Sequence, residues 1–133
     1  MSQENVELVQ SAFDAWERGD TASILDVCDE DIVVIQAAEL PGVPPRQYGH
    51  EGVLEAFAIW PEQWDDFRIE IVRTFESGDE VVVTTNQSGR GKDSGIEVAT
   101  QFTFLFTIRD RKITEWRIFM REAEALEAAR LED

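Results

Sequence analysis

Apolar side chains recur at helical spacing near the start of the chain. They predict one amphipathic helix whose stripe consists of Val6, Val9, Phe13 and Trp16. Gly19 stands where a helix commonly ends, and Asp20 is a residue type that caps the helix after it. The second helix is expected to be short and to bury Ile24, Leu25 and Cys28.

The middle of the chain alternates between strand and helix. Ile32–Gln36 is apolar and rich in β-branched residues, which predicts a short strand. Ala37–Gly49 contains three prolines and is expected to be a loop. From Glu51 to Trp60 the apolar spacing is again helical. Pro61 is expected either to end or kink this helix or to begin one further turn that ends near Trp64.

From residue 67 to residue 120 the chain has the alternation or the composition of strands. Turn signals separate them at Ser77–Asp79, Gly89–Gly95 and Arg109–Lys112. A tail rich in Ala, Glu and Leu, Arg121–Leu131, consists of strong helix formers. The predicted strands are Phe67–Ile71, Val81–Ser88, Ile96–Ile108 and Ile113–Met120. Because no linker or repeat interrupts the chain, residues 1–133 are expected to form one α+β domain with helices and strands in separate layers.

The last two predicted strands carry apolar side chains on both faces. One face holds Phe102, Phe104, Phe106 and Ile108, together with Trp116, Ile118 and Met120 of the last strand. The opposite face holds Leu105, Ile113 and Phe119. One face must cover the helices, and the apolar residues on the other indicate a partner sheet from a second copy. The alternative is that these few hydrophobic residues are simply exposed.

The chain is strongly acidic, with 12 Lys and Arg against 28 Asp and Glu and a formal net charge of −16. This charge argues against nucleic acid or an anionic membrane as a partner, because both require clustered basic residues. No apolar run approaches the roughly 20 residues that span a bilayer, and the first residues do not resemble a secretion signal. The single cysteine, Cys28, forms no internal disulfide. We therefore expect a cytoplasmic protein.

Few residues can support metal or nucleophile chemistry. His50 is the only histidine, and its place at a helix entrance favours a capping role over catalysis. Cys28 and His50 are too few for zinc, and the acidic run around Asp29 lacks the pattern of a calcium loop. Gly89–Gly95 precedes a strand, so it predicts a hairpin loop and not a phosphate loop before a helix. No metal and no cofactor are expected.

Several segments, in their order and spacing, resemble one family. They cover nearly the whole chain and are Met1–Val9, Phe13–Asp20, Tyr48–Val53, Glu62–Phe67, Gly78–Val83 and Glu122–Ala129. The resemblance is to SnoaL-like proteins, and it implies the nuclear-transport-factor-2-like fold. That fold is a cone-shaped, strongly curved mixed sheet wrapped around about three N-terminal helices, with a short C-terminal helix, a pocket inside and frequent dimerisation through the outer face.

The resemblance also implies where chemistry would lie. Ketosteroid isomerase-like and cyclase members remove a carbon-bound proton with a carboxylate and stabilise the enolate with a neutral acid or a tyrosine. In this chain the base position falls on Gln36 and the acidic position of the long strand falls on Phe104. The tyrosine position falls on or beside Ala12 and Phe13. None of these side chains transfers protons near neutral pH, so the catalytic residues, if any, are not identified.

We therefore expect an apolar pocket that binds a small molecule without the usual acid and base residues. Gln36 and Tyr48 would supply its polar groups, and the segment from Trp60 to Trp64 would act either as a lid or as packing of the helix end. The predicted lining is Phe13, Trp16, Gln36, Tyr48, Trp60, Trp64, Phe102, Phe104, Trp116, Ile118 and Met120.

Two alternatives stay open. The first is an enzyme of isomerase, cyclase or hydrolase type that uses a carboxylate elsewhere in the chain. The second is a dimerisation module with a filled core and no ligand. A homodimer through the outer sheet face is expected in all three cases.

Overall fold

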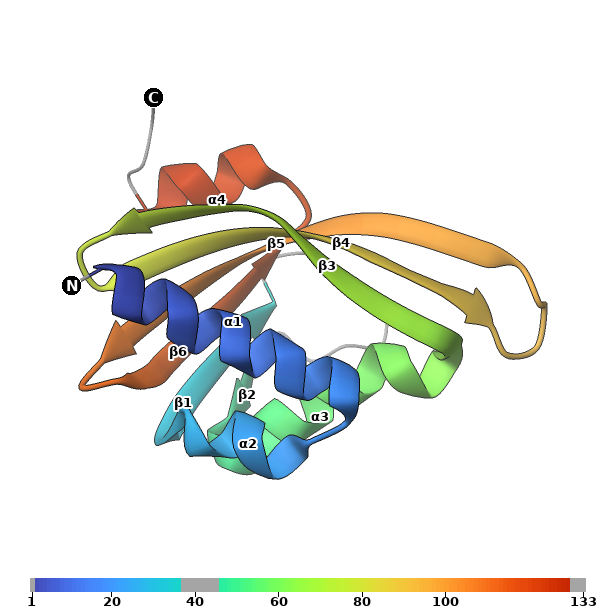
Figure 1. Cartoon of the computed structure of the whole chain (residues 1–133), viewed down its shortest axis with the longest axis horizontal. Coiled ribbons are helices and arrows are strands. Elements are labelled where there is room, and N and C mark those ends of the chain that lie inside the picture. The colour runs from blue at the N-terminus through green and yellow to red at the C-terminus, as the bar shows by residue number, and fades with distance from the viewer. Residues whose placement is uncertain (1, 37–45, 130–133) are drawn as a thin grey trace.

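The computed structural model describes residues 2–36 and 46–129, with the backbone alone for residues 2, 3 and 57–64. Its elements follow the order α1 (Ser2–Arg18), α2 (Thr21–Asp26), β1 (Cys28–Gln36), β2 (Arg46–Tyr48), α3 (Gly49–Gln63), β3 (Trp64–Ser77), β4 (Glu80–Gly91), β5 (Glu97–Arg109), β6 (Lys112–Phe119) and α4 (Glu122–Ala129). Figure 1 shows a curled sheet with α1, α2 and α3 on its concave side and α4 on its convex side. The α+β architecture expected from the sequence is confirmed.

A glycine stop separates the first two helices, as predicted. Gly19 has a φ of +73°, its N–H donates to the Trp16 carbonyl at 3.0 Å, and the Asp20 N–H donates to the Ala15 carbonyl at 2.8 Å. These two bonds form a Schellman motif. Asp20 then caps α2, accepting from the N–H of Ser23 at 3.2 Å and from its hydroxyl at 2.7 Å. These hydrogen bonds hold the pKa of Asp20 below its ordinary value.

The six strands form one mixed sheet in the order β2-β1-β6-β5-β4-β3. Only β1 and β6 pair in parallel, and the other neighbours are antiparallel. Register shifts interrupt the ladders within β1, twice along β3 and where β5 meets β6. Such irregularities bend a sheet. They explain how the sheet curls around the α1 stripe.

Aromatic rings fill the space between α1 and the concave face. Phe13 of α1 stacks on Phe104 of β5 with ring centroids 5.7 Å apart, and Phe106 stacks on Trp116 of β6 at 6.1 Å. Phe104 meets Trp116 edge-on at 5.3 Å. The neighbouring cavity, whose lining includes Cys28, Ile32 and Ile113, holds only about 10 Å³. We call this part of the interior, between α2 and the starts of β1 and β6, the closed end.

The C-terminal helix covers apolar residues on the convex face. Val82, Leu105 and Phe119 form a second hydrophobic cluster with Ala125 and Ala129 of α4. Beside it, Glu122 accepts hydrogen bonds from the buried hydroxyl of Thr84 at 2.6 Å and from Arg73 Nε at 2.8 Å. Thus α4 buries much of the convex apolar surface that led us to expect a partner sheet, and dimerisation stays a prediction.

Several expected elements differ in extent. A strand, β2, lies at the end of the predicted proline-rich loop. It has only three residues and directly follows two prolines, so it has no recognisable strand pattern in the sequence. Cys28 begins β1 and does not belong to the second helix, which ends at Asp26. The third helix continues past Pro61 to Gln63. Gly89 and Arg90 of β4 pair with β5, and Gly91 pairs with β3, so the predicted loop is shorter, although the predicted hairpin is confirmed.

One residue lies on the opposite face from that expected. Strict alternation along the last strand placed Ile113 beside Phe119 on the outer face. The register shift between Thr107 and Ile108 moves Ile113 into contact with the concave core, opposite Ile108. Sequence alternation does not reveal such an irregularity.

Replacing Glu122 by Gln tests the attachment of α4. Burial raises the pKa of Glu122, but the hydrogen bonds from Thr84 and Arg73 outweigh it and leave the pKa below its ordinary value of 4.5. We expect Glu122→Gln to lower the free energy of unfolding by about 1–2 kcal/mol at pH 7, because bonds to a charged acceptor become bonds to a neutral one. Chemical denaturation measures the change.

The difference from wild type should shrink on acidification. A lowered folded-state pKa gives stability that is complete above the unfolded pKa and is lost as the pH falls through the folded value. Glu124→Gln, at an exposed position in the same turn of α4, is the control and should change the free energy of unfolding by less than about 0.5 kcal/mol. A Glu122→Gln protein as stable as wild type at pH 7 contradicts this account.

Cys28 reports whether the closed end is sealed. Burial raises the pKa of its thiol to about 12, so very little thiolate exists at pH 8. We expect an aromatic disulfide reagent to leave the native protein unmodified for hours and to react at once in denaturant. Ser94→Cys, in the exposed hairpin loop, provides a matched thiol that should react within minutes. Native Cys28 reacting as fast as that control would show an open interior.

Candidate functional site

The end of the concave face opposite the closed end brings polar side chains among apolar ones. β1 and β6 run parallel, and β5 and β4 are each antiparallel to the strand before them in the sheet. The C-terminal ends of β1, β6 and β4 and the N-terminal end of β5 therefore lie on the same side of the sheet, along the strand direction. We call the side chains there the glutamine end: Gln36, Ile69, Thr85, Gln87, Phe102 and Ile118. Most of them lie deep in the concave core, and Gln36 is partly buried.

Apart from the fully buried Thr85, Gln87 is the most buried polar side chain at this end, with 4% of its surface exposed. Its register partner on β3 is Ile69, which belongs to the concave core, so Gln87 shares that face. Its Nε2 lies 3.4 Å from the hydroxyl oxygen of Thr85, and that hydroxyl donates to the carbonyl of Phe102 at 2.9 Å. Its carbonyl oxygen, Oε1, is buried and has no hydrogen-bond partner within the described part of the chain.

Two further glutamines, on β1 and β2 at the opposite edge of the sheet from β3, also have a buried Oε1 atom without a partner in the described chain. Gln36 lies opposite Ile118, and Gln47 of β2 lies opposite Val34. Among the described residues, neither Oε1 atom has a hydrogen-bond partner, and both atoms are buried. Gly52 allows α3 to approach this edge, because a Cβ there would lie 2.8 Å from the backbone carbon of Gln47. Among the side chains that the structure describes, three amide carbonyls are thus buried and unpaired on the helix-covered side.

Ionisable groups are scarce in this interior. Among the residues whose side chains the structure describes, no buried one is Asp, Glu, His, Lys or Arg, and Cys28 is a thiol whose raised pKa keeps it neutral. His50 is partly buried and contacts the Cys28 carbonyl through Nε2 at 3.0 Å, in keeping with the expected local role at the helix entrance. Glu17 accepts from the Ile69 N–H at 3.2 Å, which attaches α1 to the outer edge of β3.

The predicted pocket residues divide into four groups. The structure brings together six of them in the concave core: Phe13, Trp16, Phe102, Phe104, Trp116 and Ile118. Gln36 lies at the glutamine end beside them. Tyr48 is 63% exposed because it lies on the other face of β2 from Gln47, and Met120 is 45% exposed because it follows the end of β6. The side chains of Trp60 and Trp64 lie outside the described residues.

Sequence reasoning missed Gln87, Thr85 and Gln47. A signal for the first two exists in the strand Val81–Ser88, where positions 81, 83, 85 and 87 share a face and change from valine to threonine and glutamine. Polar residues on a core-facing row need hydrogen-bond partners, so such a change marks a candidate site. Gln47 offered no comparable pattern, since β2 was not recognised.

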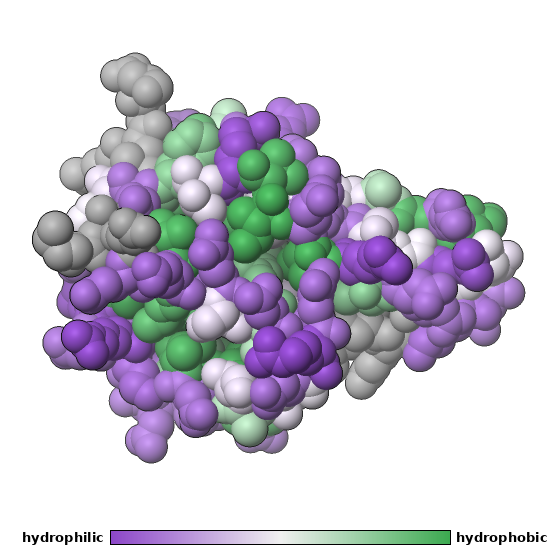
Figure 2. Space-filling model, in the orientation of Figure 1, coloured by the Kyte–Doolittle hydropathy of each residue, from purple (hydrophilic) through white to green (hydrophobic). Residues whose placement is uncertain are grey.

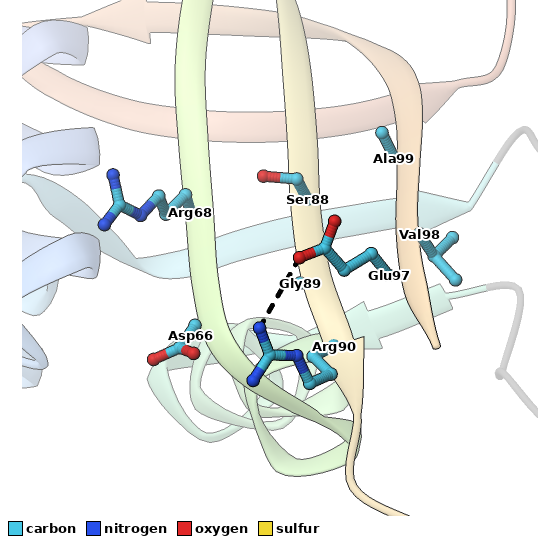
Figure 3. Close-up of a pocket in the computed structure, with 8 residues that line it drawn as sticks. All are labelled: Asp66, Arg68, Ser88, Gly89, Arg90, Glu97, Val98 and Ala99. Carbon is cyan, nitrogen blue, oxygen red and sulfur yellow. Dashed lines mark hydrogen bonds and ion pairs between the residues drawn. The ribbon is translucent and has the colours of Figure 1, made fainter. Parts of the chain in front are cut away.

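A second hollow lies on the convex face, near the start of β3, the end of β4 and the start of β5. It measures about 610 Å³ and is lined by Asp66, Arg68, Ser88, Gly89, Arg90, Glu97, Val98 and Ala99. Figure 3 shows Arg90 paired with Glu97 across neighbouring strands, at 3.4 Å, while Arg68 points away from that pair. All the charged side chains in it are exposed or only partly buried. This groove is shallow and polar and has none of the burial that a small apolar ligand needs.

Other kinds of site are absent from the described residues. They contain no group of three or more His, Cys, Asp or Glu that would hold a metal ion. Within the same residues, no helix is long and apolar enough to cross a membrane. Figure 2 shows hydrophilic residues over most of the face that carries α1, with smaller hydrophobic areas between them.

Comparison with solved structures identifies similar folds. One is TerC co-crystallised with polyporic acid, with a TM-score of 0.78, 22% identity, and coverage of 93% of this chain and 96% of that one. A putative SnoaL-like polyketide cyclase from Jannaschia sp. CCS1 also has a TM-score of 0.78 and 22% identity, with coverage of 96% and 92%. A hypothetical protein with a ketosteroid isomerase-like fold from Catenulispora acidiphila, in complex with trimethylamine, has a TM-score of 0.74 and 17% identity, with coverage of 91% and 90%.

These identities establish a shared fold and leave the activity open. None of the curated proteins compared with the chain matches it. The family model of the SnoaL-like domain matches residues 9–116, which span α1 to β6 and include Gln36, Gln87 and the aromatic core. The curled sheet, the N-terminal helices and the family match agree, and the chain belongs to the SnoaL-like family.

Proposed function

We propose that this protein binds a small, mostly apolar molecule at the glutamine end and transfers no proton to or from it. The observation that carries the proposal is the pairing of an aromatic core with buried amide carbonyls that lack partners in the described residues. A buried, unpaired carbonyl costs free energy, so natural proteins keep few of them without a purpose. A ligand, or water that it displaces, would supply the missing hydrogen bonds.

The residues at the positions where the family resemblance places the acid and base support the proposed absence of proton transfer. A general base must reach the substrate and titrate near the working pH. Neither Gln36 nor Phe104 has a side chain that titrates near neutral pH, and the described interior buries no carboxylate or imidazole. Two of the similar structures contain polyporic acid and trimethylamine, and these complexes support small-molecule binding in this fold.

A second candidate is the module with a filled core. The cavity of only about 10 Å³ at the closed end favours it, because that half of the interior has no room for a ligand. The two candidates differ only at the glutamine end. A filled core predicts no binding of any apolar probe there.

Binding of N-phenyl-1-naphthylamine, a neutral fluorescent probe, tests the proposal. We expect micromolar affinity and a rise in Tm that grows with probe concentration, because the probe binds the folded state alone. Gln36→Trp should weaken binding at least tenfold by filling the end of β1, whereas Tyr48→Trp, at an exposed position of the neighbouring strand, should bind like wild type. A probe that neither binds nor shifts the Tm supports the filled module.

We also propose that two copies pair through the convex face of β3, β4 and β5. The charges around the groove have both signs, Asp66 and Glu97 against Arg68 and Arg90, and a two-fold pair of identical surfaces would match them. Light scattering should give twice the chain mass of 15.2 kDa. Ala99→Arg should shift the protein toward monomer, and Ser94→Arg in the hairpin loop should not. A wild-type monomer at micromolar concentration contradicts the proposal.

A further inference from the structure

We infer that the ligand of the glutamine end presents a neutral hydroxyl or N–H donor to Gln87 Oε1. The inference rests on the proposed function and specifies the class of molecule that the site selects. It depends on which way the Gln87 amide faces and on what surrounds its free oxygen.

The hydrogen bonds around Thr85 fix the orientation of the amide. A threonine hydroxyl has one proton, and Thr85 gives it to the Phe102 carbonyl, which can only accept. The oxygen of Thr85 can therefore only accept from Gln87, which requires the NH2 group to face it, as the 3.4 Å contact has it. With the amide reversed, Gln87 Oε1 would face the Thr85 hydroxyl oxygen, and both atoms would be acceptors with no proton between them. Gln87 Oε1 is thus held away from Thr85, as an acceptor.

An acceptor in this position discriminates between ligands. A hydroxyl or N–H group that reaches Oε1 satisfies a buried oxygen that has no other partner in the described chain. An ether or ketone oxygen at the same place would face it with no hydrogen between them and would leave both unpaired. Such a mismatch in a buried site changes affinity by roughly tenfold or more.

A neutral donor fits better than a cation. An ammonium group deep in the interior needs an anionic partner to offset the loss of hydration. The buried residues of the described chain include no carboxylate, and Glu17 is exposed and already accepts from the β3 backbone. The net charge of −16 would attract cations to the surface, but it supplies no buried counter-charge at Gln87.

Three naphthalenes separate these possibilities: 2-naphthol, 2-methoxynaphthalene and 2-naphthylmethylamine. Their dissociation constants are measured by displacement of N-phenyl-1-naphthylamine or by calorimetry at pH 7. We expect wild type to bind 2-naphthol roughly tenfold more tightly than either of the other two. Gln87→Met removes the acceptor at similar volume and should bring 2-naphthol and its methyl ether to within about twofold. Gln101→Met, on the convex face, should keep the wild-type ratio.

Thr85 is a positioning residue in this account, and its variants give an independent readout. Thr85→Val frees the amide to turn its NH2 toward the ligand, so affinity for 2-methoxynaphthalene should rise severalfold while that for 2-naphthol falls. A merely structural loss would weaken both ligands. Thr85→Ser retains the hydroxyl and should restore the wild-type preference.

A measurement on the wild-type protein alone also tests the inference, so the test does not depend on the variants folding. The side-chain amide resonances of Gln87 should shift more on addition of 2-naphthol than on addition of the ether at equal saturation, because only the naphthol donates a hydrogen bond to Oε1. Equal affinity of wild type for 2-naphthol and its ether, tighter binding of the amine, or an unchanged ratio in Gln87→Met would each overturn the inference while leaving apolar binding intact. Failure of every naphthalene and of the fluorescent probe would instead overturn the proposed function.

Discussion

The contact between the α1 aromatic stripe and the concave face of the sheet is the constraint on which the other features depend. Phe13 stacks on Phe104, and Phe104 in turn meets Trp116, so three elements far apart in the sequence share one set of rings. Burying these large side chains stabilises the fold most, and it requires the sheet to curl around the helix. The register shifts supply that curl.

Because the closed end is filled, the glutamine end is where we propose that a ligand binds. The closed end is packed with apolar atoms and has almost no free volume. Toward the glutamine end, the rows that face the core change from valine and phenylalanine to threonine and glutamine. Amides bring hydrogen-bonding capacity without charge, which suits recognition of an apolar molecule better than acid–base chemistry. In this respect the chain keeps the architecture of its family and lacks ionisable groups at the positions where the resemblance placed them.

Much of this organisation was predictable from the sequence because it depends on local patterns. The α1 stripe, the Gly19 stop, the Asp20 cap and the aromatic row of β5 follow directly from spacing and residue type. The predictions that were wrong concern features that depend on contacts between segments distant in the sequence. The face of Ile113 is decided by a register shift, and the cover over Leu105 is an α4 helix whose docking its composition does not reveal. The role that we propose for Gln87 could not be predicted, because it depends on the hydrogen bond that Thr85 donates to the Phe102 carbonyl.

The central claim is that an apolar molecule occupies the glutamine end of the concave face. Nuclear Overhauser effects between N-phenyl-1-naphthylamine and the protein's methyl groups test it most directly, because they locate the bound probe. The account predicts contacts to the methyl groups of Ile118 and Ile69 and none to the methyl group of Ala99 in the convex groove. Contacts confined to Ala99, or a saturated complex with no contact to either isoleucine, would contradict it.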